Sequence, residues 1–386
     1  MLKILYAGSP APAATTLRLL LEKCSQGQNA ANENGSQDQN VAASGDCSQD
    51  QNGGASQNGS QDQKGGGWKI AGVLTNPPSA KGRHKELVPT DVGLLAQERG
   101  IPVFCPQKLD AAARDQIAAQ GFDALVCFAY GKIFGPKFLS LFKAGGVNVH
   151  PSLLPKYRGA TPVPAAILNC DGQTGVTVQT LALGMDEGEI LAQEVIALDG
   201  TETTDSLLDK SAQIAAALLQ SLLDKAAQNP GAEILKKGKA QEGEPSYTKT
   251  ISKEDALINW NDSAKNIAAA VRAYTSEPGS WTRIGGEGGE TLKILKAAPL
   301  SLEADNGSQG QEAAPSSQSG VSDLSASSGQ PTVPGTVTAF DKKRGILVQC
   351  GDGLLCVTEL QRQQKKAMGY KDFMNGARDF VGTRLG

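Results

Sequence analysis

The sequence has few histidines, few aromatic residues and no long hydrophobic run. Only two of its 386 residues are histidines, His84 and His150, and only 5% are aromatic. Two histidines are too few for a His-rich metal centre. The seven cysteines are an odd number without a C-x-x-C pair, which excludes a small disulfide scaffold. Any chemistry that a histidine performs must therefore use His84 or His150.

The lack of long apolar stretches indicates a protein without transmembrane helices. No stretch comes near the roughly 18 consecutive apolar residues that a transmembrane helix needs. The first residues, Met1–Gly8, enter a strand-like run directly, without the pattern of a signal peptide. We therefore expect a cytoplasmic protein with reduced cysteines and no membrane partner. We also expect a monomer.

Two polar tracts account for much of the unusual composition. Residues 25–67 and 302–334 consist mainly of small and polar residues and contain no aromatic residue. Such segments bury too little apolar surface to offset chain entropy, so we predict two disordered inserts. Each tract carries a net charge of −4 and the whole chain −3, so the remaining 310 residues carry +5. A mildly basic core permits a nucleic-acid partner.

The rest of the chain shows two successive patterns. Strand-like runs and amphipathic helices alternate up to residue 228, which predicts an α/β fold with a doubly wound, mostly parallel, Rossmann-like sheet. After a basic linker at 229–245, one helix near 262–274 is followed by short strands separated by glycines. This second pattern predicts a small C-terminal β-barrel of the OB-like type. The expected domains are therefore 1–228 and 246–386.

One strand of the first pattern ends in polar residues that suit carbonyl chemistry. Asn148 and His150 are two residues apart in the strand at 146–150, so they point to the same face. They lie at its carboxyl end, where open α/β sheets bind ligands. An amide that stabilises an oxyanion beside an imidazole that moves protons suits attack on a carbonyl carbon. An isolated N-x-H is more commonly a structural polar pair, so this motif alone does not decide the function.

Two further segments follow neighbouring strands. Asp186 lies in a glycine-flanked turn after the strand at 175–181, where its carboxylate could orient the ring of His150. It could equally shape the turn. The run at 128–134 contains Tyr130 and Gly131 and follows the strand at 123–128; its apolar side chains could line a pocket for a flat ring, or belong to the core.

Together these segments resemble the folate-dependent formyltransferases over nearly the whole of the core. The resemblance rests on A-G-S-P at 7–10, N-P-P-S-A-K-G-R at 76–83, F-A-Y-G-K-I at 128–133, N-V-H-P-S-L-L-P-K-Y-R-G-A at 148–160, G-M-D-E-G-E-I at 184–190 and Y-T-K-T-I-S-K-E-D-A-L-I-N-W at 247–260. The block that joins N-x-H, S-L-L-P and R-G-A to a downstream D-x-G is highly specific.

The resemblance implies a reaction and a set of functional residues. A formyl group would pass from the co-substrate 10-formyltetrahydrofolate to the α-amino group of initiator methionyl-tRNA, leaving tetrahydrofolate and using no metal. The implied residues are Asn148, His150 and Asp186 for catalysis, Ser152, Leu153, Leu154, Pro155, Tyr130 and Gly131 for folate, and Lys81, Arg83 and Lys85 for tRNA. The barrel would also bind tRNA.

Two other functions fit parts of the sequence. A sugar-nucleotide or other amine formyltransferase would use the same N-x-H…D site, but the long basic loop at 76–90 and the run at 247–260 favour a tRNA substrate. A non-catalytic RNA-binding protein, in which only the barrel acts, belongs to a different class. It would not depend on His150.

Overall fold

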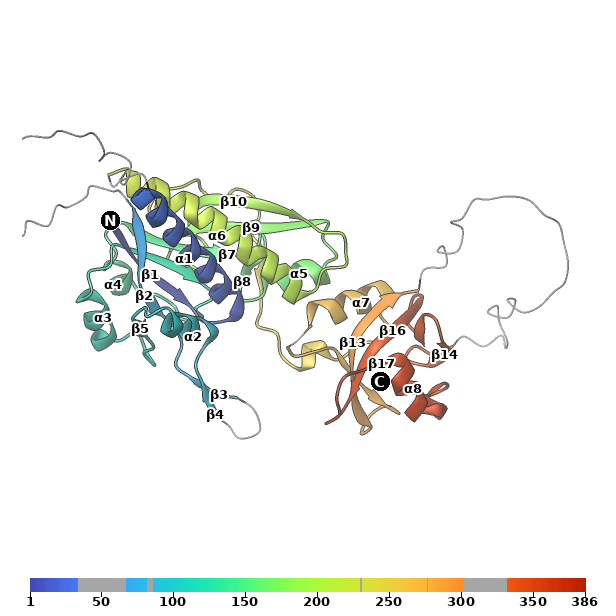
Figure 1. Cartoon of the computed structure of the whole chain (residues 1–386). Helices are drawn as coiled ribbons and strands as arrows, with labels where there is room; N and C mark the ends of the chain where they lie inside the picture. Colours follow the sequence, from blue (N-terminus) through green and yellow to red (C-terminus); the bar gives the residue numbers. More distant parts are fainter. Residues whose placement is uncertain (34–66, 82–85, 230, 276, 301–331) are drawn as a thin grey trace, which may run out of the picture. The chain divides into compact units, whose positions relative to one another are not determined.

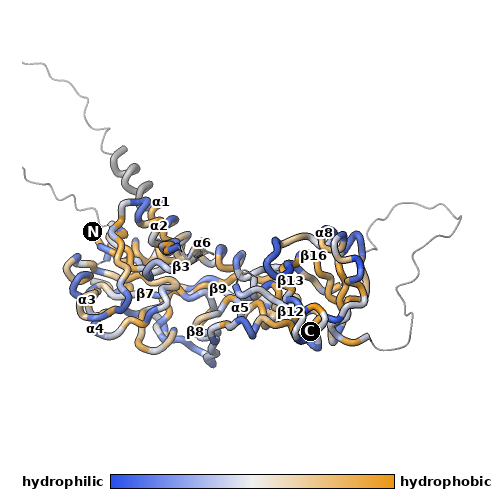
Figure 2. The backbone as a smooth tube through the Cα atoms, turned by 90° about the horizontal axis from the view of Figure 1, so that it is seen from below, coloured by the Kyte–Doolittle hydropathy of each residue, from blue (hydrophilic) through white to orange (hydrophobic). Residues whose placement is uncertain are grey.

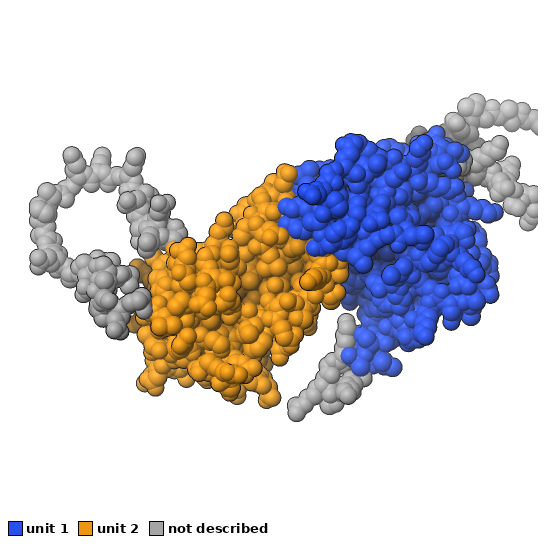
Figure 3. All heavy atoms as spheres, turned by 180° about the vertical axis from the view of Figure 1, so that it is seen from behind, with its two compact units in different colours: residues 1–159, 174–196, 208–247 blue, residues 160–173, 197–207, 248–386 orange. Residues whose placement is uncertain are grey.

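The chain folds into two compact units. The computed structural model describes residues 1–33, 67–81, 86–229, 231–275, 277–300 and 332–386 (Figure 1). The first unit comprises Met1–Gly159, Thr174–Ile196 and Leu208–Tyr247, and the second comprises Ala160–Gln173, Ala197–Leu207 and Thr248–Gly386 (Figure 3). Each unit therefore draws on more than one segment of the sequence.

A seven-stranded sheet forms the first unit. Its strands, in spatial order, are β10(Ile190–Ala197), β9(Gln173–Thr180), β7(Gly145–His150), β6(Ala124–Phe128), β1(Leu2–Gly8), β2(Trp68–Leu74) and β5(Val103–Phe104). The pairings from β7 to β5 are parallel, whereas β9 runs antiparallel to β7. All five residues of β6 are buried, as expected for a strand covered on both faces. The predicted α/β fold class is confirmed.

Helices connect these strands, and side chains cap several of them. They are α1(Ala11–Glu33), α2(Asp91–Glu98), α3(Ala111–Ala118), α4(Pro136–Leu139) and α6(Thr204–Gln228). Thr90 caps α2 by accepting a hydrogen bond from Gly93 N, and Asp110 caps α3 in the same way from Ala113 N. The long helices α1 and α6 lie side by side, joined by a hydrogen bond of 3.0 Å from Thr16 Oγ1 to Ala212 O (Figure 1).

The structure differs from the prediction made from the sequence mainly in two elements. Helix α1 continues to Glu33, nine residues into the tract at 25–67 that we expected to be disordered; Ala, Gln and Glu there are good helix formers and no proline stops them. Residues 34–66 and 301–331 lie outside the described residues. Strand β10 was not predicted from the sequence, because seven of its eight residues face partly or fully outward without a clear alternation.

The second unit is a curled antiparallel sheet with helices against it. The strand order is β12(Trp281–Ile284), β13(Glu290–Pro299), β16(Leu354–Arg362), β15(Gly345–Gln349) and β14(Val337–Asp341), and β17(Met368–Gly369) pairs with β16. The helical elements are α5(Pro162–Leu168), η1(Glu254–Ala256), α7(Ala264–Ala273), α8(Tyr370–Gly376) and η2(Arg378–Phe380). The predicted small barrel is thus confirmed as a curled half-barrel.

The last residues of the chain join the two ends of this curled sheet. Leu385 bridges Ile284 at the end of β12, and Arg384 bridges Thr336 beside β14. Backbone hydrogen bonds from Gly285 N to Arg384 O and from Leu385 N to Gly335 O, both 2.8 Å, hold this segment on both sides. The side chain of Leu385 is only 2% exposed and belongs to the core of the unit. The C-terminal segment therefore closes the sheet.

Each unit has its own hydrophobic core. In the first unit a stack of aromatic rings packs with residues of β1, β2 and β6 on one side of the sheet. In the second, residues of α7 pack with those of β13, β15 and β16. Figure 2 shows hydrophobic segments in both units. Among the described residues, no helix combines the length and the apolar character needed to cross a membrane, and no three His, Cys, Asp or Glu side chains form a metal-binding group.

Candidate active site

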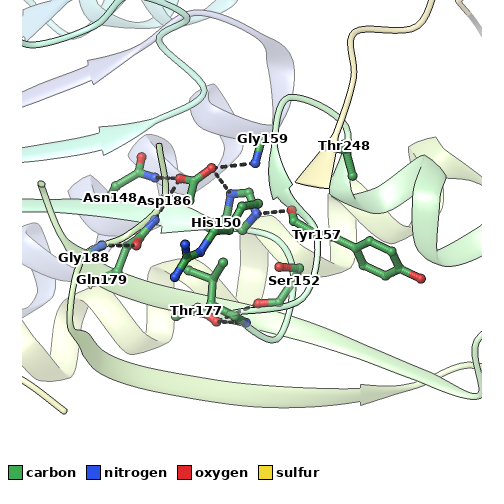
Figure 4. A network of polar contacts seen from close by, with 12 residues as sticks. Asn148, His150, Ser152, Tyr157, Gly159, Thr177, Gln179, Asp186, Gly188 and Thr248 are labelled. Atoms are coloured by element: carbon green, nitrogen blue, oxygen red, sulfur yellow. Dashed lines mark hydrogen bonds and ion pairs between the residues drawn. The ribbon is translucent and has the colours of Figure 1, made fainter. Parts of the chain in front are cut away.

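Two adjacent strands supply the polar side chains at the carboxyl end of β7. Asn148 and His150 lie on one face of β7, and in the register with β9 they stand opposite Gln179 and Thr177. His150, Thr177 and Gln179 are buried, with at most 4% of each exposed. Four polar side chains thus gather on one face at the edge where Asp186 follows (Figure 4).

The carboxylate of Asp186 is the centre of this group. Its Oδ1 accepts hydrogen bonds from Gln179 Nε2 at 2.8 Å and from Asn148 Nδ2 at 3.3 Å. Its Oδ2 accepts one from Gly159 N at 2.8 Å and lies 3.5 Å from His150 Nδ1. The backbone of Asp186 has a φ of 55°, in the left-handed region that costs energy for a residue with a side chain. The turn therefore aims this carboxylate at both residues of the N-x-H motif.

A hydrogen bond at one nitrogen of the His150 imidazole decides which of its two nitrogens can exchange a proton. His150 Nε2 lies 2.8 Å from the carbonyl oxygen of Tyr157. A carbonyl oxygen only accepts, so Nε2 carries a hydrogen, and Nδ1 is left to gain or lose one opposite Asp186. Burial lowers the pKa of His150 below its ordinary 6.5, while the negative charge of Asp186 opposes that shift. The neutral ring is therefore favoured at rest, and Asp186 stabilises the charged ring once it forms.

The loop after His150 is held by strand β9. It contains the residues Ser152, Leu153, Leu154 and Pro155, for which we expected contact with folate. Thr177 Oγ1 donates to Ser152 O at 2.6 Å, accepts from Leu154 N at 3.3 Å, and accepts from Gln193 Nε2 at 2.8 Å. Because these residues follow His150 directly, a ligand seated on the loop lies next to the imidazole.

The ring of Tyr130 lies in the core, one of the two placements that the sequence left open. Its ring is 1% exposed and stacks on Phe134, with centroids 5.4 Å apart, inside the aromatic core. Burial raises the pKa of Tyr130 to about 12. Its backbone oxygen accepts a hydrogen bond of 2.8 Å from Asn76 Nδ2, and Lys132 Nζ lies 5.7 Å from the centroid of its ring. Gly131, which is exposed and has a φ of 81°, begins the turn after it. The contact of Tyr130 and Gly131 with folate stays a prediction.

The basic loop is only partly described. Strands β3(Ser79–Lys81) and β4(Glu86–Val88) form a small antiparallel hairpin. Arg83, His84 and Lys85 lie outside the described residues, and for Lys81 only the backbone is described. The proposed tRNA contacts of Lys81, Arg83 and Lys85 stay predictions.

Three further residues around the site, Thr177, Gln179 and Gln241, belong to no motif that the sequence singles out. Thr177 and Gln179 alternate in the strand at 175–181, a signal that would have placed them on one face, but only the pairing with β7 shows that the face is that of His150. Gln241 lies in the expected linker at 229–245. Its Nε2 donates to Asp186 O at 2.7 Å and to Gly188 O at 2.8 Å, and its Oε1 accepts from Arg158 Nη2 at 2.8 Å. No local pattern in the linker indicates this position.

Comparison with known proteins places the chain among formyl-transferring enzymes. Residues 41–223 match the formyl transferase family and residues 250–378 its C-terminal domain. The methionyl-tRNA formyltransferase of Treponema denticola is 40% identical over 321 residues, which cover 81% of this chain and 91% of the relative. The enzyme of the same name from Treponema pallidum strain Nichols is 39% identical over 332 residues, 82% of this chain and 92% of the relative.

One solved structure shows a similar fold. A sugar N-formyltransferase from Shewanella sp FDAARGOS_354 matches with a TM-score of 0.50 and 15% identity, over 78% of this chain and 99% of that protein. At this identity the likeness concerns the fold and not the substrate.

Proposed function

The chain belongs to the methionyl-tRNA formyltransferase family, and we propose that it formylates initiator methionyl-tRNA for translation initiation. The formyl donor is 10-formyltetrahydrofolate, and the acceptor is the α-amino group of the methionine. The observation that carries the proposal is the contact of Asn148, His150 and Asp186 beside the loop at 152–155. We propose a monomeric, cytoplasmic enzyme.

His150 is proposed as the proton acceptor. The amine that attacks the formyl carbon must lose a proton as the new C–N bond forms. Nδ1 of the neutral ring takes this proton, since Nε2–H is engaged with the Tyr157 carbonyl oxygen. The resulting positive charge lies 3.5 Å from Asp186 Oδ2, which stabilises it. The bond between the formyl carbon and the folate nitrogen then breaks, this nitrogen takes the proton back from Nδ1, and tetrahydrofolate leaves with His150 neutral again. The reaction needs no metal, because the side chains supply the proton transfer.

Asn148 is proposed as the donor to the developing oxyanion. An amide has two N–H bonds, and the contact with Asp186 Oδ1 uses one of them. The other can donate to the formyl oxygen as it becomes negatively charged, and the protonated His150 adds a favourable charge. Asp186 thus orients both residues of the motif.

The loop Ser152–Leu153–Leu154–Pro155 is proposed to seat the formyl donor, which supplies the carbon that the amine attacks. Thr177 and Gln193 fix its backbone, and Gly131 leaves an exposed turn without a side chain. The proposal for Tyr130 is reduced to its backbone, because its ring is in the aromatic core. The donor site is thus formed mainly by backbone next to His150.

An assay of acceptor choice tests the proposed function. Purified full-length protein would be given 10-formyltetrahydrofolate with initiator methionyl-tRNA, or with an amino-sugar nucleotide in a parallel reaction. We expect formyl transfer to the tRNA only. Transfer to the amino sugar without transfer to the tRNA would assign the chain to the other branch of formyltransferases.

The proposed tRNA contacts need their own variant. Arg83→Ala should raise the KM for the tRNA more than the KM for the folate, because a phosphate contact is lost. Lys137→Ala, an exposed cation on α4, serves as the matched control. An Arg83 variant with both KM values unchanged would mean that the loop does not bind the tRNA.

A further inference from the structure

Gln179 makes the shortest hydrogen bond from a side chain to the carboxylate of Asp186. Its Nε2 lies 2.8 Å from Oδ1, whereas Asn148 Nδ2 lies 3.3 Å from the same atom. Gln179 is 1% exposed and stands opposite Asn148 in the pairing of β9 with β7. A buried amide in this position can direct the carboxylate without touching the reacting atoms.

The orientation of the Gln179 amide follows from its second contact. Gly188 N lies 3.1 Å from Gln179 Oε1, and a backbone N–H can only donate. The oxygen must therefore face Gly188, which leaves Nε2 to donate to Asp186 (Figure 4). Gln179 thus joins the two sides of the turn that contains Asp186, from the carboxylate to the N–H of residue 188.

A second amide supports the first. Gln241 Nε2 lies 3.4 Å from Gln179 Oε1 and donates to the carbonyl oxygens of Asp186 and Gly188. Its Oε1 accepts from Arg158, whose neighbour Gly159 donates to Asp186 Oδ2. The turn with the strained backbone of Asp186 is therefore held from β9 and from the segment at 229–245.

We propose that Gln179 is a positioning residue for the reaction: its amide holds Oδ1 of Asp186 so that Oδ2 faces Nδ1 of His150. The inference rests on the proposed function. With Oδ1 held, Oδ2 already faces Nδ1 before His150 becomes charged. The side chain of Gln241 reinforces the same turn by donating to the backbone oxygens of Asp186 and Gly188.

The surroundings of Asp186 allow the position of its carboxylate to be followed through the pKa of His150. The titratable groups that the described residues place near this carboxylate are His150, the Cys127 thiol of β6, and the ion pair of Arg158 with Glu187. Burial raises the pKa of Cys127 to about 12, so this thiol stays neutral through the pH range of the assay. His150 is then the group that responds near neutral pH.

Two substitutions test the role of Gln179. Gln179→Met keeps an unbranched side chain but removes the donor, and should lower kcat by about tenfold to a hundredfold with both KM values little changed. Gln179→Glu keeps an acceptor for Gly188 N, and its carboxyl group stays protonated beside Asp186 Oδ1, because two carboxylates this close cannot both ionise. It therefore keeps a donor to Asp186 and should retain more of kcat than Gln179→Met. Gln213→Met, on α6 away from these contacts, is the control and should match the wild type.

The two readouts separate the possible failures. The wild type is assayed for formylation of initiator methionyl-tRNA, and the imidazole signal of His150 is titrated by NMR in a His84→Ala background, where one histidine remains. A lowered kcat together with a downward shift of the NMR pKa of His150 in Gln179→Met supports the inference, because a carboxylate that is no longer held opposite Nδ1 stabilises the charged ring less. Unchanged kcat or an unshifted His150 pKa in Gln179→Met overturns it. If Gln179→Met does not fold, Gln179→Glu decides: its rate should fall at high pH, where its own carboxyl group ionises against Asp186, and a pH profile like that of the wild type overturns the inference. A wild type that does not formylate tRNA refutes the proposed function instead, and the NMR titration still tests the contact.

Discussion

At the scale of single residues, the site depends on which atom of each polar group is already engaged. His150 illustrates this, because the Tyr157 carbonyl oxygen occupies Nε2 and leaves Nδ1 for Asp186. The sequence predicts that an amide, an imidazole and a carboxylate meet, and the structure brings Asn148, His150 and Asp186 together. The sequence does not predict the tautomer of His150. The tautomer depends on the carbonyl oxygen of Tyr157, which reaches Nε2 only because the chain turns back at Tyr157, with a φ of 62°.

The lowered pKa of His150 predicts a pH dependence. The neutral ring accepts the proton, so kcat/KM should fall as pH drops through the pKa of the folded protein, which lies below the ordinary 6.5. Stability has the same sign: the unfolded chain protonates this histidine first, so stability is full above 6.5 and falls as the pH drops below it. A pH–rate profile of kcat/KM measures this, and an acid limb centred above 6.5 would contradict it.

A substitution of Thr177 tests binding of the formyl donor separately from the chemical step. Thr177→Val keeps the shape but leaves Ser152 O and Gln193 Nε2 without this partner, and should raise the KM for folate by roughly tenfold, with kcat little changed. Thr16→Val is a matched control, since Thr16 is also fully buried and donates to a backbone oxygen, Ala212 O. Both variants should lower the melting temperature, but only Thr177→Val should change the KM for folate. An equal change of this KM in Thr16→Val would show that Thr177 has no specific role in donor binding.

At the scale of elements, strand β9 has two tasks. It packs in the sheet, and its alternate residues Thr177 and Gln179 fix the loop at 152–155 and the Asp186 turn. The apolar and polar alternation of residues 175–181 predicts the strand. Its antiparallel pairing with β7 depends on the long-range order of the sheet, which no local pattern contains, so the roles of Thr177 and Gln179 could not be predicted.

Gly175 tests how closely β9 approaches the donor loop. A Cβ at this position would overlap the Leu153 side chain and Glu194 O. Gly175→Ala should therefore shift Leu153 and weaken folate binding, measured as a raised Kd for tetrahydrofolate. Gly172→Ala, where a Cβ would meet nothing within 4 Å, should bind as the wild type does. Equal Kd values for both variants would show that the close approach is unimportant.

At the scale of the whole molecule, the overall composition does not represent the folded units, because it includes the two polar tracts. The net charge of −3 includes the two acidic tracts, and the charge of +5 outside them agrees better with an RNA substrate. The alternation of strands and helices predicts the first unit, and glycine-separated short strands predict the second. The closure of the second sheet by Arg384 and Leu385 could not be predicted, because these residues bridge Thr336 and Ile284, which lie far earlier in the sequence.

Leu385→Ala tests this closure. Removing a fully buried leucine side chain should cost about 2–5 kcal/mol in the free energy of unfolding of the second unit. In a Trp68→Phe background the remaining Trp260 and Trp281 both report on this unit by fluorescence. Leu257→Ala, at a side chain that is 44% exposed, should change the urea midpoint little. Equal midpoints for the two variants would contradict the closing role.

The central claim is that this chain transfers a formyl group to methionyl-tRNA through His150. The most direct measurement compares single-turnover formylation of initiator methionyl-tRNA by the wild type and by His150→Ala, with tRNA binding measured in parallel. We predict that the rate falls by about a hundredfold to ten-thousandfold while tRNA affinity is unchanged. A variant that formylates at the wild-type rate would contradict the account.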